Sequence, residues 1–253
     1  MKVGVLITAR LKSTRLTRKV LRDLEGKPLI VHLIDRMHQV HLADSVSIIT
    51  STVPQDDELE NLCDNHGVKC FRGDPDDVLV RIRDAAAEQN LSWVLSVTAD
   101  NPWVCPIWAD RLLSKAIGDN WDFGRIEGLP FGAFSYALKA SAVQKACEIK
   151  DSSQTEVWGG YLDSRWGFST GIIEVPEPSQ VRKPKYRLTV DTSEDFKVAT
   201  MIAQNFKTTD SPASLADIVQ FLDANPKILK INQRIQQAPA RKIKLKEQFE
   251  KNL

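Results

Sequence analysis

The fold is decided by the opening stretch, in which residues 2–8 (KVGVLIT) lead directly into residues 9–19 (ARLKSTRLTRK). The first part is a short apolar run rich in β-branched residues, which is typical of a buried strand. The second part is strongly basic, so the strand ends there and a loop begins. Apolar residues then recur at helical spacing from Leu29 to Met37, behind Pro28, which suits the first turn of a helix. The opening therefore predicts a strand, a basic loop and a helix in succession.

The same alternation continues along the first half of the chain. Further strands are expected at residues 45–50, 68–71 and 92–97. Helices are expected at residues 56–66, 77–89 and 106–117. This rhythm predicts an α/β fold with three α/β/α layers around a mostly parallel sheet.

The second half of the chain has a weaker pattern. Strands are expected at residues 131–138, 169–175 and 187–190, and helices at residues 140–148, 153–161, 192–206 and 214–222. We expect one domain over residues 1–230, with a distinct subregion at about 120–185. Residues 231–253 should form a basic helical tail, which is better explained as a solvated helix than as an arm that binds nucleic acid.

Composition argues against several classes of protein. The 253 residues include 34 Lys and Arg and 33 Asp and Glu, so the net charge of +1 does not suit a nucleic-acid or membrane-surface binder. No apolar run is long enough to cross a bilayer. The four cysteines are scattered without a C-x-x-C pair, so neither a zinc site nor a disulfide framework is expected. We expect a cytoplasmic protein that binds neither nucleic acid nor membrane.

The loop after the first strand contains five cations within ten positions: Arg10, Lys12, Arg15, Arg18 and Lys19. Ligands of open α/β sheets bind at the carboxyl ends of strands. Guanidinium groups grip phosphate oxygens in a fork and lysine adds a point charge, so the loop suits a triphosphate. Neither a Walker A motif nor a dinucleotide fingerprint is present. From charge alone, a phosphate site and a solvated basic turn are equally well supported.

Two aspartates are candidate metal ligands. Asp100 follows the strand at 92–97, and Asp191 ends the strand at 187–190. A parallel sheet can bring both to one edge, and Mg²⁺ commonly takes one or two carboxylates together with substrate phosphates. The alternatives are that Asp191 only caps the following helix and that Asp100 only forms a turn before Pro102.

Several short motifs occur in a fixed order along the chain. They are A-R-x-x-S-T-R-L at 9–16 with Lys19, G-K-P-L-I at 26–30, T-S-T at 50–52, F-R-G at 71–73, D-D-V-L at 76–79, D-x-P at 100–102 and L-T-V-D-T-S-E-D-F at 188–196. In this the chain resembles the cytidylyltransferases that activate acidic sugars, such as the CMP-Kdo and CMP-sialic acid synthetases, and in particular their SpsF-like branch of spore-coat polysaccharide synthesis.

The resemblance implies a nucleotide-diphospho-sugar transferase-like fold, CTP as donor and a homodimer. It implies that Ala9 lies near the nucleotide and that the phosphates are held by Arg10, Ser13, Arg15 and Lys19. The family usually has Pro-Gly where this chain has residues 17–18 (TR), which adds a cation to the loop.

The expected function is Mg²⁺-dependent transfer of CMP from CTP to an acidic sugar or related acceptor, with release of pyrophosphate, in the synthesis of precursors for surface polysaccharides. The expected catalytic residues are Arg10, Arg15, Lys19 and Asp100, and the expected ligands of Mg²⁺ are Asp100 and Asp191. Two alternatives stay open: a glycosyltransferase that uses a nucleotide sugar, and a member that binds a nucleotide without catalysis.

Residues 120–185 should hold the acceptor and include a candidate dimerisation surface. A histidine that relatives often carry in this region is missing. Its aromatic residues Trp158, Tyr161 and Trp166 are more often core residues than sugar platforms. The candidate cations for an acceptor carboxylate or phosphate are Arg72, Arg125, Lys183, Lys185 and Arg187.

Overall fold

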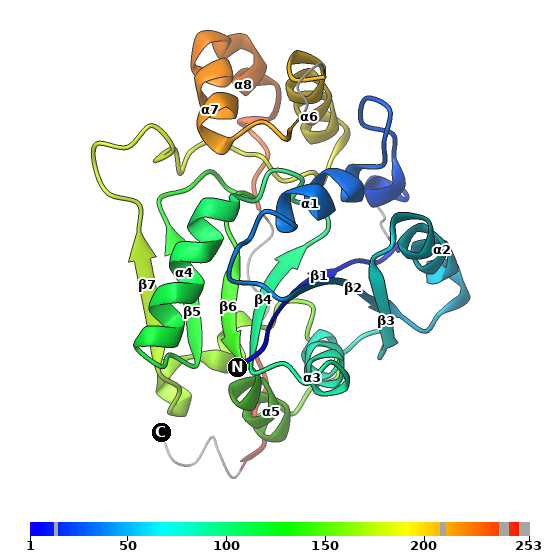
Figure 1. Ribbon diagram of the computed structural model, residues 1–253, viewed down its shortest axis with the longest axis vertical. Coiled ribbons are helices and arrows are strands. Elements are labelled where there is room, and N and C mark those ends of the chain that lie inside the picture. Colours follow the sequence, from blue (N-terminus) through cyan, green and yellow to red (C-terminus); the bar gives the residue numbers. More distant parts are fainter. Residues whose placement is uncertain (13–14, 208–210, 238–242, 248–253) are drawn as a thin grey trace.

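The computed structural model describes residues 1–12, 15–207, 211–237 and 243–247. Its strands form one seven-stranded sheet in the order β3-β2-β1-β4-β6-β5-β7 (Figure 1). β6 runs antiparallel to β4 and β5, and the other pairings are parallel. The strands are β1 (Val3–Thr8), β2 (Ser45–Ser51), β3 (Lys69–Gly73), β4 (Trp93–Thr98), β5 (Phe123–Glu127), β6 (Tyr136–Lys139) and β7 (Thr170–Glu174).

Helices cover both faces of this sheet. The α-helices are α1 (Leu29–Met37), α2 (Asp57–His66), α3 (Val78–Glu88), α4 (Pro106–Gly118), α5 (Ala140–Ile149), α6 (Ser193–Asn205), α7 (Leu215–Ala224) and α8 (Pro226–Asn232). Short 3-10 turns lie at Lys19–Leu21 (η1), Pro54–Asp56 (η2), Gly159–Leu162 (η3) and Ser164–Trp166 (η4).

The alternation of side chains along each strand explains the layers. Val5 and Leu95 belong to a core cluster with the apolar residues of α1, α2 and α4. Their neighbours Leu6 and Val94 belong to a second cluster with α3 and α5. Successive strand residues point to opposite faces, so β1 and β4 are buried on both. The predicted three-layer α/β/α fold with a mostly parallel sheet is confirmed.

Several elements differ from the sequence-based expectation. The strand expected at 131–138 is confined to β6, and the helix α8 was not expected. β5 was not predicted, because the segment 123–127 (FGRIE) mixes glycine and charged residues with its buried positions. Residues 187–190 are extended but form a single bridge, between Arg187 and Phe131, rather than a strand. Residues 153–161 form no α-helix and are irregular up to η3, which starts at Gly159. A glycine pair at 159–160 offers little helix propensity there.

The described part of the segment after α8 also differs from the expected solvated helix, and residues 238–242 and 248–253 of that expected helix lie outside the described residues. Residues 233–237 and 243–246 are not helical. Leu245 is buried and forms a bridge with Lys150, and Asp151 donates its backbone N–H to the carbonyl of Lys244 at 2.8 Å. This part of the tail therefore packs against the domain instead of extending into solvent.

The strand order creates the place where a ligand would bind. The chain runs outward from β1 through β2 to β3 and then returns to β4 on the other side of β1, so the order of the strands reverses between β1 and β4. Ligands of open α/β sheets bind outside the carboxyl ends of the strands at such a point. The loop after β1 and the turn after β4 both leave the sheet at this edge. α6, α7 and α8 gather above it, at the top of Figure 1. In the described part of the chain, no helix is both long and apolar enough to span a membrane.

Candidate active site

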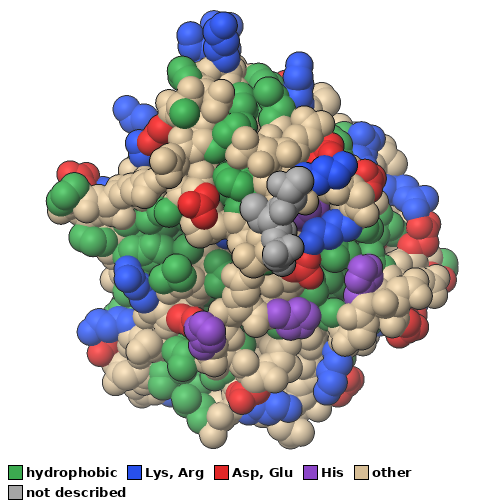
Figure 2. Space-filling model, turned by 45° about the horizontal axis from the view of Figure 1, so that its top comes forward, with side chains coloured by type: hydrophobic (Ala, Val, Ile, Leu, Met, Phe, Trp, Pro, Cys, Tyr) green, Lys and Arg blue, Asp and Glu red, His purple; other side chains and the backbone are tan. Residues whose placement is uncertain are grey.

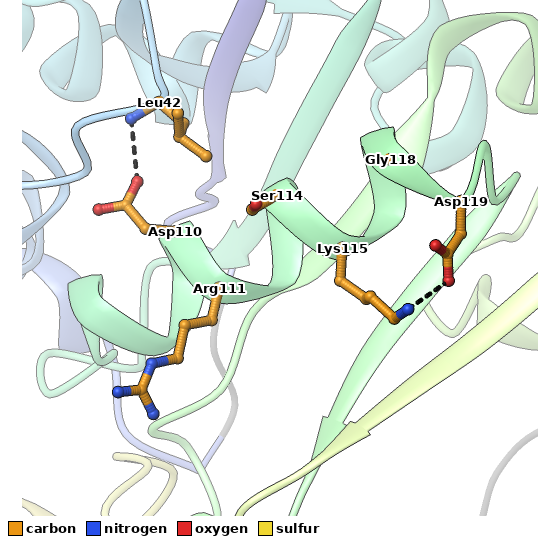
Figure 3. A pocket seen from close by; sticks show the side chains of 7 residues that line it. All are labelled: Leu42, Asp110, Arg111, Ser114, Lys115, Gly118 and Asp119. Atoms are coloured by element: carbon orange, nitrogen blue, oxygen red, sulfur yellow. Dashed lines mark hydrogen bonds and ion pairs between the residues drawn. The ribbon is translucent and has the colours of Figure 1, made fainter.

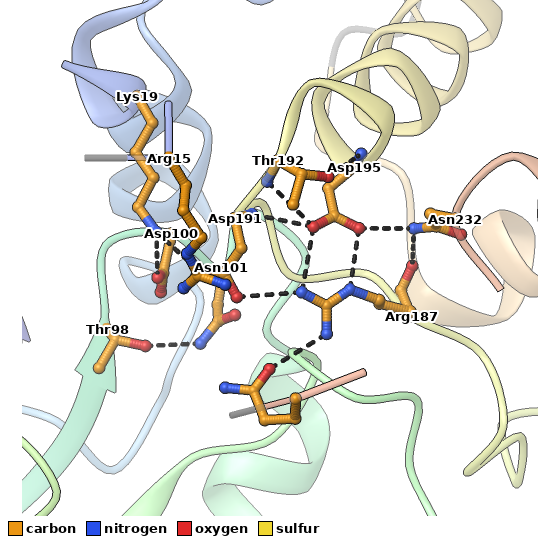
Figure 4. A network of polar contacts seen from close by, with 11 residues as sticks. Arg15, Lys19, Thr98, Asp100, Asn101, Arg187, Asp191, Thr192, Asp195 and Asn232 are labelled. Atoms are coloured by element: carbon orange, nitrogen blue, oxygen red, sulfur yellow. Dashed lines mark hydrogen bonds and ion pairs between the residues drawn. The ribbon is translucent and has the colours of Figure 1, made fainter. Parts of the chain in front are cut away.

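Two carboxylates meet at this edge around one lysine (Figure 4). The Nζ atom of Lys19 donates to Oδ2 of Asp100 at 2.7 Å and to Oδ1 of Asp191 at 2.9 Å. Arg15 reaches the same oxygen of Asp191 from solvent at 3.1 Å. The residues come from the loop after β1, the turn after β4 and the segment before α6. The structure thus brings together two aspartates that are far apart in the sequence.

A tight turn after β4 positions Asp100. The N–H of Ala99 donates to the carbonyl of Thr8 at 2.9 Å, which extends the pairing of β4 with β1 by one residue. Asn101 closes the turn by donating its N–H to the carbonyl of Thr98 at 3.1 Å and its side-chain amide to the Thr98 hydroxyl at 2.6 Å. Asp100 therefore lies in a turn, as one alternative held, and its carboxylate also faces the site.

Asp191 is fixed by its neighbours in the sequence. The N–H of Val190 donates to the carbonyl of Asp100 at 2.9 Å, which joins the two segments directly. The N-cap of α6 is Thr192, which forms a capping box with Asp195. The alternative that Asp191 caps this helix is therefore wrong, and its carboxylate is left to face the site.

A buried arginine holds the far side of Asp191. Arg187 donates to Oδ2 of Asp191 at 3.0 Å and to both oxygens of Asp195, at 2.9 and 3.0 Å. Asn232 donates to Asp195 at 2.9 Å and to the carbonyl of Arg187 at 3.0 Å. This network leaves Oδ1 of Asp191 as the oxygen that faces Lys19 and Arg15.

The charges of the cluster stabilise one another. Burial raises the pKa of Asp191, but the positive charges of Lys19 and Arg15 together with that of Arg187 outweigh burial and lower it below its ordinary value. Burial likewise lowers the pKa of Lys19, but Asp100 and Asp191 outweigh burial and raise it. Both shifts keep this lysine and Asp191 ionised at neutral pH.

The other loop residues lie apart from the carboxylate pair. Arg10 lies 3.8 Å from Asp76, and its Nε atom is buried without a partner. Ala9 is buried, and its N–H donates to the carbonyl of Ile49 at 3.1 Å. Arg18 pairs with Glu58 on α2. Ser13 lies outside the described residues. Of the described loop cations, Arg15 and Lys19 are those that contact the two aspartates.

Most of the candidate acceptor-binding cations are engaged elsewhere. Arg72 pairs with two acidic residues of α2, Arg125 pairs with Glu127, and Lys183 pairs with Asp223. Lys185 is exposed. Among the aromatic candidates, Trp158 and Tyr161 are buried and Trp166 is partly buried and donates to the carbonyl of Gly160, as expected of core residues.

Sequence analysis missed the residues that support the site. Arg187 was assigned to the acceptor and instead binds Asp191. Asp195 was detectable as part of a helix N-terminal signature, but its contact with Arg187 was not. Asn232 gave no local pattern, because it reaches Asp195 from 37 residues further along the chain.

The donor set fits a hard divalent cation. Asp100 and Asp191 each present one carboxylate oxygen to a single cationic atom, the Nζ of Lys19. Oxygen donors of this kind suit Mg²⁺, which completes its shell with phosphate oxygens and water. No cluster of three or more His, Cys, Asp or Glu suited to a metal occurs among the described residues, which fits a metal held by two carboxylates with phosphate oxygens and water.

Two surface features do not compete with this site. A shallow pocket lies along the exposed side of α4, and Figure 3 shows its lining residues, none of which comes from the loops after β1 and β4. On the face shown in Figure 2, acidic and basic side chains are interspersed. The carboxylate pair with its two cations therefore remains the candidate active site.

Comparison with known proteins shows that the chain is a nucleotidyltransferase. The chain belongs to the cytidylyltransferase family, whose model matches residues 4–206. The predicted family is thereby confirmed, and the protein is a CTP-dependent nucleotidyltransferase.

One relative agrees with this assignment, and two solved structures share the fold. The chain is 30% identical to the spore coat polysaccharide biosynthesis protein SpsF of Bacillus subtilis over 229 residues, which cover 87% of this chain and 94% of SpsF. A cytidylyltransferase structure from Leptospira borgpetersenii superposes with a TM-score of 0.82 at 24% identity, covering 94% of this chain and 100% of that one. A CMP-2-keto-3-deoxy-manno-octonic acid synthetase in complex with CTP superposes with a TM-score of 0.63 at 19% identity, covering 81% of this chain and 100% of that one.

Proposed function

We propose that the protein transfers CMP from CTP to a small acidic sugar or a related acceptor, releases pyrophosphate and requires Mg²⁺. The observation that carries this proposal is the meeting of Asp100 and Asp191 with Lys19 and Arg15 at the carboxyl ends of β1 and β4. Two carboxylates and two cations at one rim suit a metal bound to a triphosphate.

The reaction needs little covalent chemistry from the protein. The acceptor hydroxyl oxygen forms a bond to the α-phosphorus of CTP, the bond from this phosphorus to the bridging oxygen of the β-phosphate breaks, and the hydroxyl proton passes to solvent. Positioning and neutralisation of charge then supply most of the reduction of the barrier. Bound Mg²⁺ supplies neutralisation of phosphate charge and lowers the pKa of the attacking hydroxyl.

We assign roles to the residues of the chain on this basis. Asp100 and Asp191 hold the metal, and Arg187 keeps Asp191 oriented through the contacts described above. Arg15 and Lys19 stabilise the negative charge that develops on the departing pyrophosphate. Arg10 and the backbone at Ala9 contact the nucleotide. Ser13 is assigned to the phosphates by resemblance alone.

The acceptor class is supported by the names of relatives. A 3-deoxy-manno-octulosonate cytidylyltransferase of Polynucleobacter asymbioticus is 37% identical over 107 residues, which cover 40% of this chain and 40% of that protein. This match is partial, and the pairing of Arg72 and Arg125 with acidic neighbours argues that an acceptor anion is held by other groups.

The experiment is a screen for pyrophosphate release. CTP and the other nucleoside triphosphates are offered with Mg²⁺ and a panel of acidic sugars and phosphonates, with Asp100→Asn as the inactive control. We expect release with CTP and at least one acid, and little with the control. Release of a nucleoside diphosphate from a nucleotide sugar, without pyrophosphate from CTP, would contradict the proposal and favour the glycosyltransferase.

The homodimer and the cytoplasmic location remain predictions. Sedimentation velocity of the purified chain tests the first: a single species at twice the mass of 28.4 kDa supports it and a species at that mass opposes it.

A further inference from the structure

The side chain of Lys19 lies where a metal ion would lie. Its ammonium nitrogen is 2.7 Å from Oδ2 of Asp100 and 2.9 Å from Oδ1 of Asp191, and the side chain is 14% exposed. Both of these oxygens accept from Lys19, whereas the other oxygen of Asp191, Oδ2, accepts from Arg187. The lysine therefore already neutralises the pair that the proposed function assigns to Mg²⁺.

A divalent ion and this ammonium group compete for the same position. Mg²⁺ binds carboxylate oxygens at about 2.1 Å, closer than the lysine nitrogen approaches them. A metal ion bound between the two carboxylates would lie within a few ångströms of that nitrogen, where like charges repel strongly in a partly buried site. Metal binding thus requires the ammonium group to leave.

The local structure allows the side chain to move while its backbone stays. Lys19 starts η1, and the next residue, Val20, is buried. The stem of a lysine is flexible and its ammonium group binds phosphate as a point charge. Arg187, in contrast, is held by Asp195 on the opposite side of Asp191. Arg15 contacts only one of the two carboxylates, and its side chain is half exposed.

We propose that Lys19 is a built-in counter-ion of the metal site, which keeps free divalent ions out and moves to the triphosphate when metal and nucleotide arrive together. This inference rests on the proposed function, because it takes the two aspartates as metal ligands. It makes binding of the metal depend on the nucleotide: the phosphates give the displaced ammonium group new partners and the metal additional ligands.

A titration without nucleotide tests the exchange. Mn²⁺ is added to the full-length chain, and free Mn²⁺ is followed by its electron paramagnetic resonance signal. Lys19→Met removes the charge and keeps a side chain of similar length. We expect this variant to bind Mn²⁺ at least about tenfold more tightly than the unchanged protein, which lies within the usual range of coupling between two binding events. Equal affinities would overturn the proposal.

Two further variants show that the effect depends on this charge and this position. Lys19→Arg keeps a cation beside the aspartates and should bind free Mn²⁺ as weakly as the unchanged protein. Lys27→Met removes a cation that lies just before α1 and pairs with Asp35 in the last turn of that helix, and should change nothing. If Lys27→Met raised the affinity as much as Lys19→Met, the net charge of the protein and not the exchange would be responsible, and the proposal would fail.

A measurement on the unchanged protein covers the case in which Lys19→Met does not fold. Calorimetric titration of CTP is performed with Mn²⁺ and with a chelator. We expect Mn²⁺ to raise the affinity for CTP at least about tenfold, because coupling between two ligands is reciprocal, while Mn²⁺ alone binds weakly. Tight binding of Mn²⁺ alone would refute the counter-ion role but leave the proposed function standing. No effect of Mn²⁺ on CTP binding would count against the proposed function itself.

Discussion

At the scale of single residues, the site depends on how the second oxygen of Asp191 is engaged by Arg187. Asp195 is fully buried and accepts from Arg187, Asn232 and the backbone N–H groups of Asp191 and Thr192. A buried carboxylate that accepts this many hydrogen bonds is held in one orientation. Asp195 therefore fixes the position of Arg187, and Arg187 in turn orients the carboxylate of Asp191.

Arg187→Met should be strongly destabilising. Removal of the arginine leaves the buried Asp195 without its cation, which typically costs about 3–5 kcal/mol. Arg125→Met breaks an exposed pair with Glu127 and should cost about 1 kcal/mol or less. Urea unfolding of both variants measures the difference. Similar losses in the two would mean that the buried network is not a structural support of the site.

At the scale of elements, the helix that follows Asp191 carries the site. α6 and α7 both begin with a capping box, formed by Thr192 with Asp195 and by Ser214 with Asp217. The two caps are chemically alike, but only the first lies beside Asp191, the proposed metal ligand. This pair allows the effect of a cap on stability to be separated from its effect on catalysis.

Thr192→Ala and Ser214→Ala should each lower the free energy of unfolding by about 1 kcal/mol, the usual cost of losing an N-cap. We expect only Thr192→Ala to lower turnover as well, because it loosens the backbone next to Asp191. Thermal melting and pyrophosphate release measure the two effects. A loss of turnover in Ser214→Ala that matches that of Thr192→Ala would contradict this account.

α1 carries a pH-sensitive contact. His32 is partly buried, and its Nε2 atom lies 2.7 Å from the carbonyl of Leu24. Burial lowers the pKa of this imidazole below 6.5, because the effect of burial is larger than the opposite effect of the hydrogen bond to that carbonyl. The unfolded chain therefore binds a proton at His32 before the folded chain does, so stability should fall as the pH drops below about 6.5.

His32→Gln should reduce this acid sensitivity. Its free energy of unfolding is expected to fall less between pH 7 and 5 than that of the unchanged protein, as measured by urea unfolding at several pH values. His41→Gln, at an exposed position, is the matched control and should follow the unchanged protein. If all three curves are parallel, His32 does not contribute to the pH dependence.

At the scale of the whole molecule, the sequence predicted the layers and the first half of the sheet because their periodic patterns are local. The buried runs of β1 and β4 and the spacing in α1 can be recognised without any knowledge of tertiary contacts. The order of the last three strands and the antiparallel β6 could not be predicted, because they depend on pairings between distant segments.

The site was predictable to the same degree. The position of Asp100 follows from its place just after a strand of a parallel sheet, and that of Lys19 from its place in the loop after β1 together with the family resemblance. The lysine bridge between the carboxylates and the role of Asn232 were not predictable, because both depend on contacts across long stretches of chain. Arg10 shows the reverse case. Its position in the basic loop predicted that it lies with Arg15, but its guanidinium group lies beside Asp76.

The most direct test of the carboxylate pair is the dependence of CTP affinity on Mg²⁺, measured by calorimetry. It compares the unchanged protein with Asp100→Asn and with the control Asp119→Asn. The control alters an exposed ion pair with Lys115 on the distant α4 surface. We predict that Mg²⁺ raises the affinity for CTP at least about tenfold in the unchanged protein and in the control, a gain typical of coupled ligands. Asp100→Asn should lose this gain in affinity, while its cooperative thermal unfolding shows that it is still folded. An equal gain in Asp100→Asn would contradict the assignment of the metal to this rim.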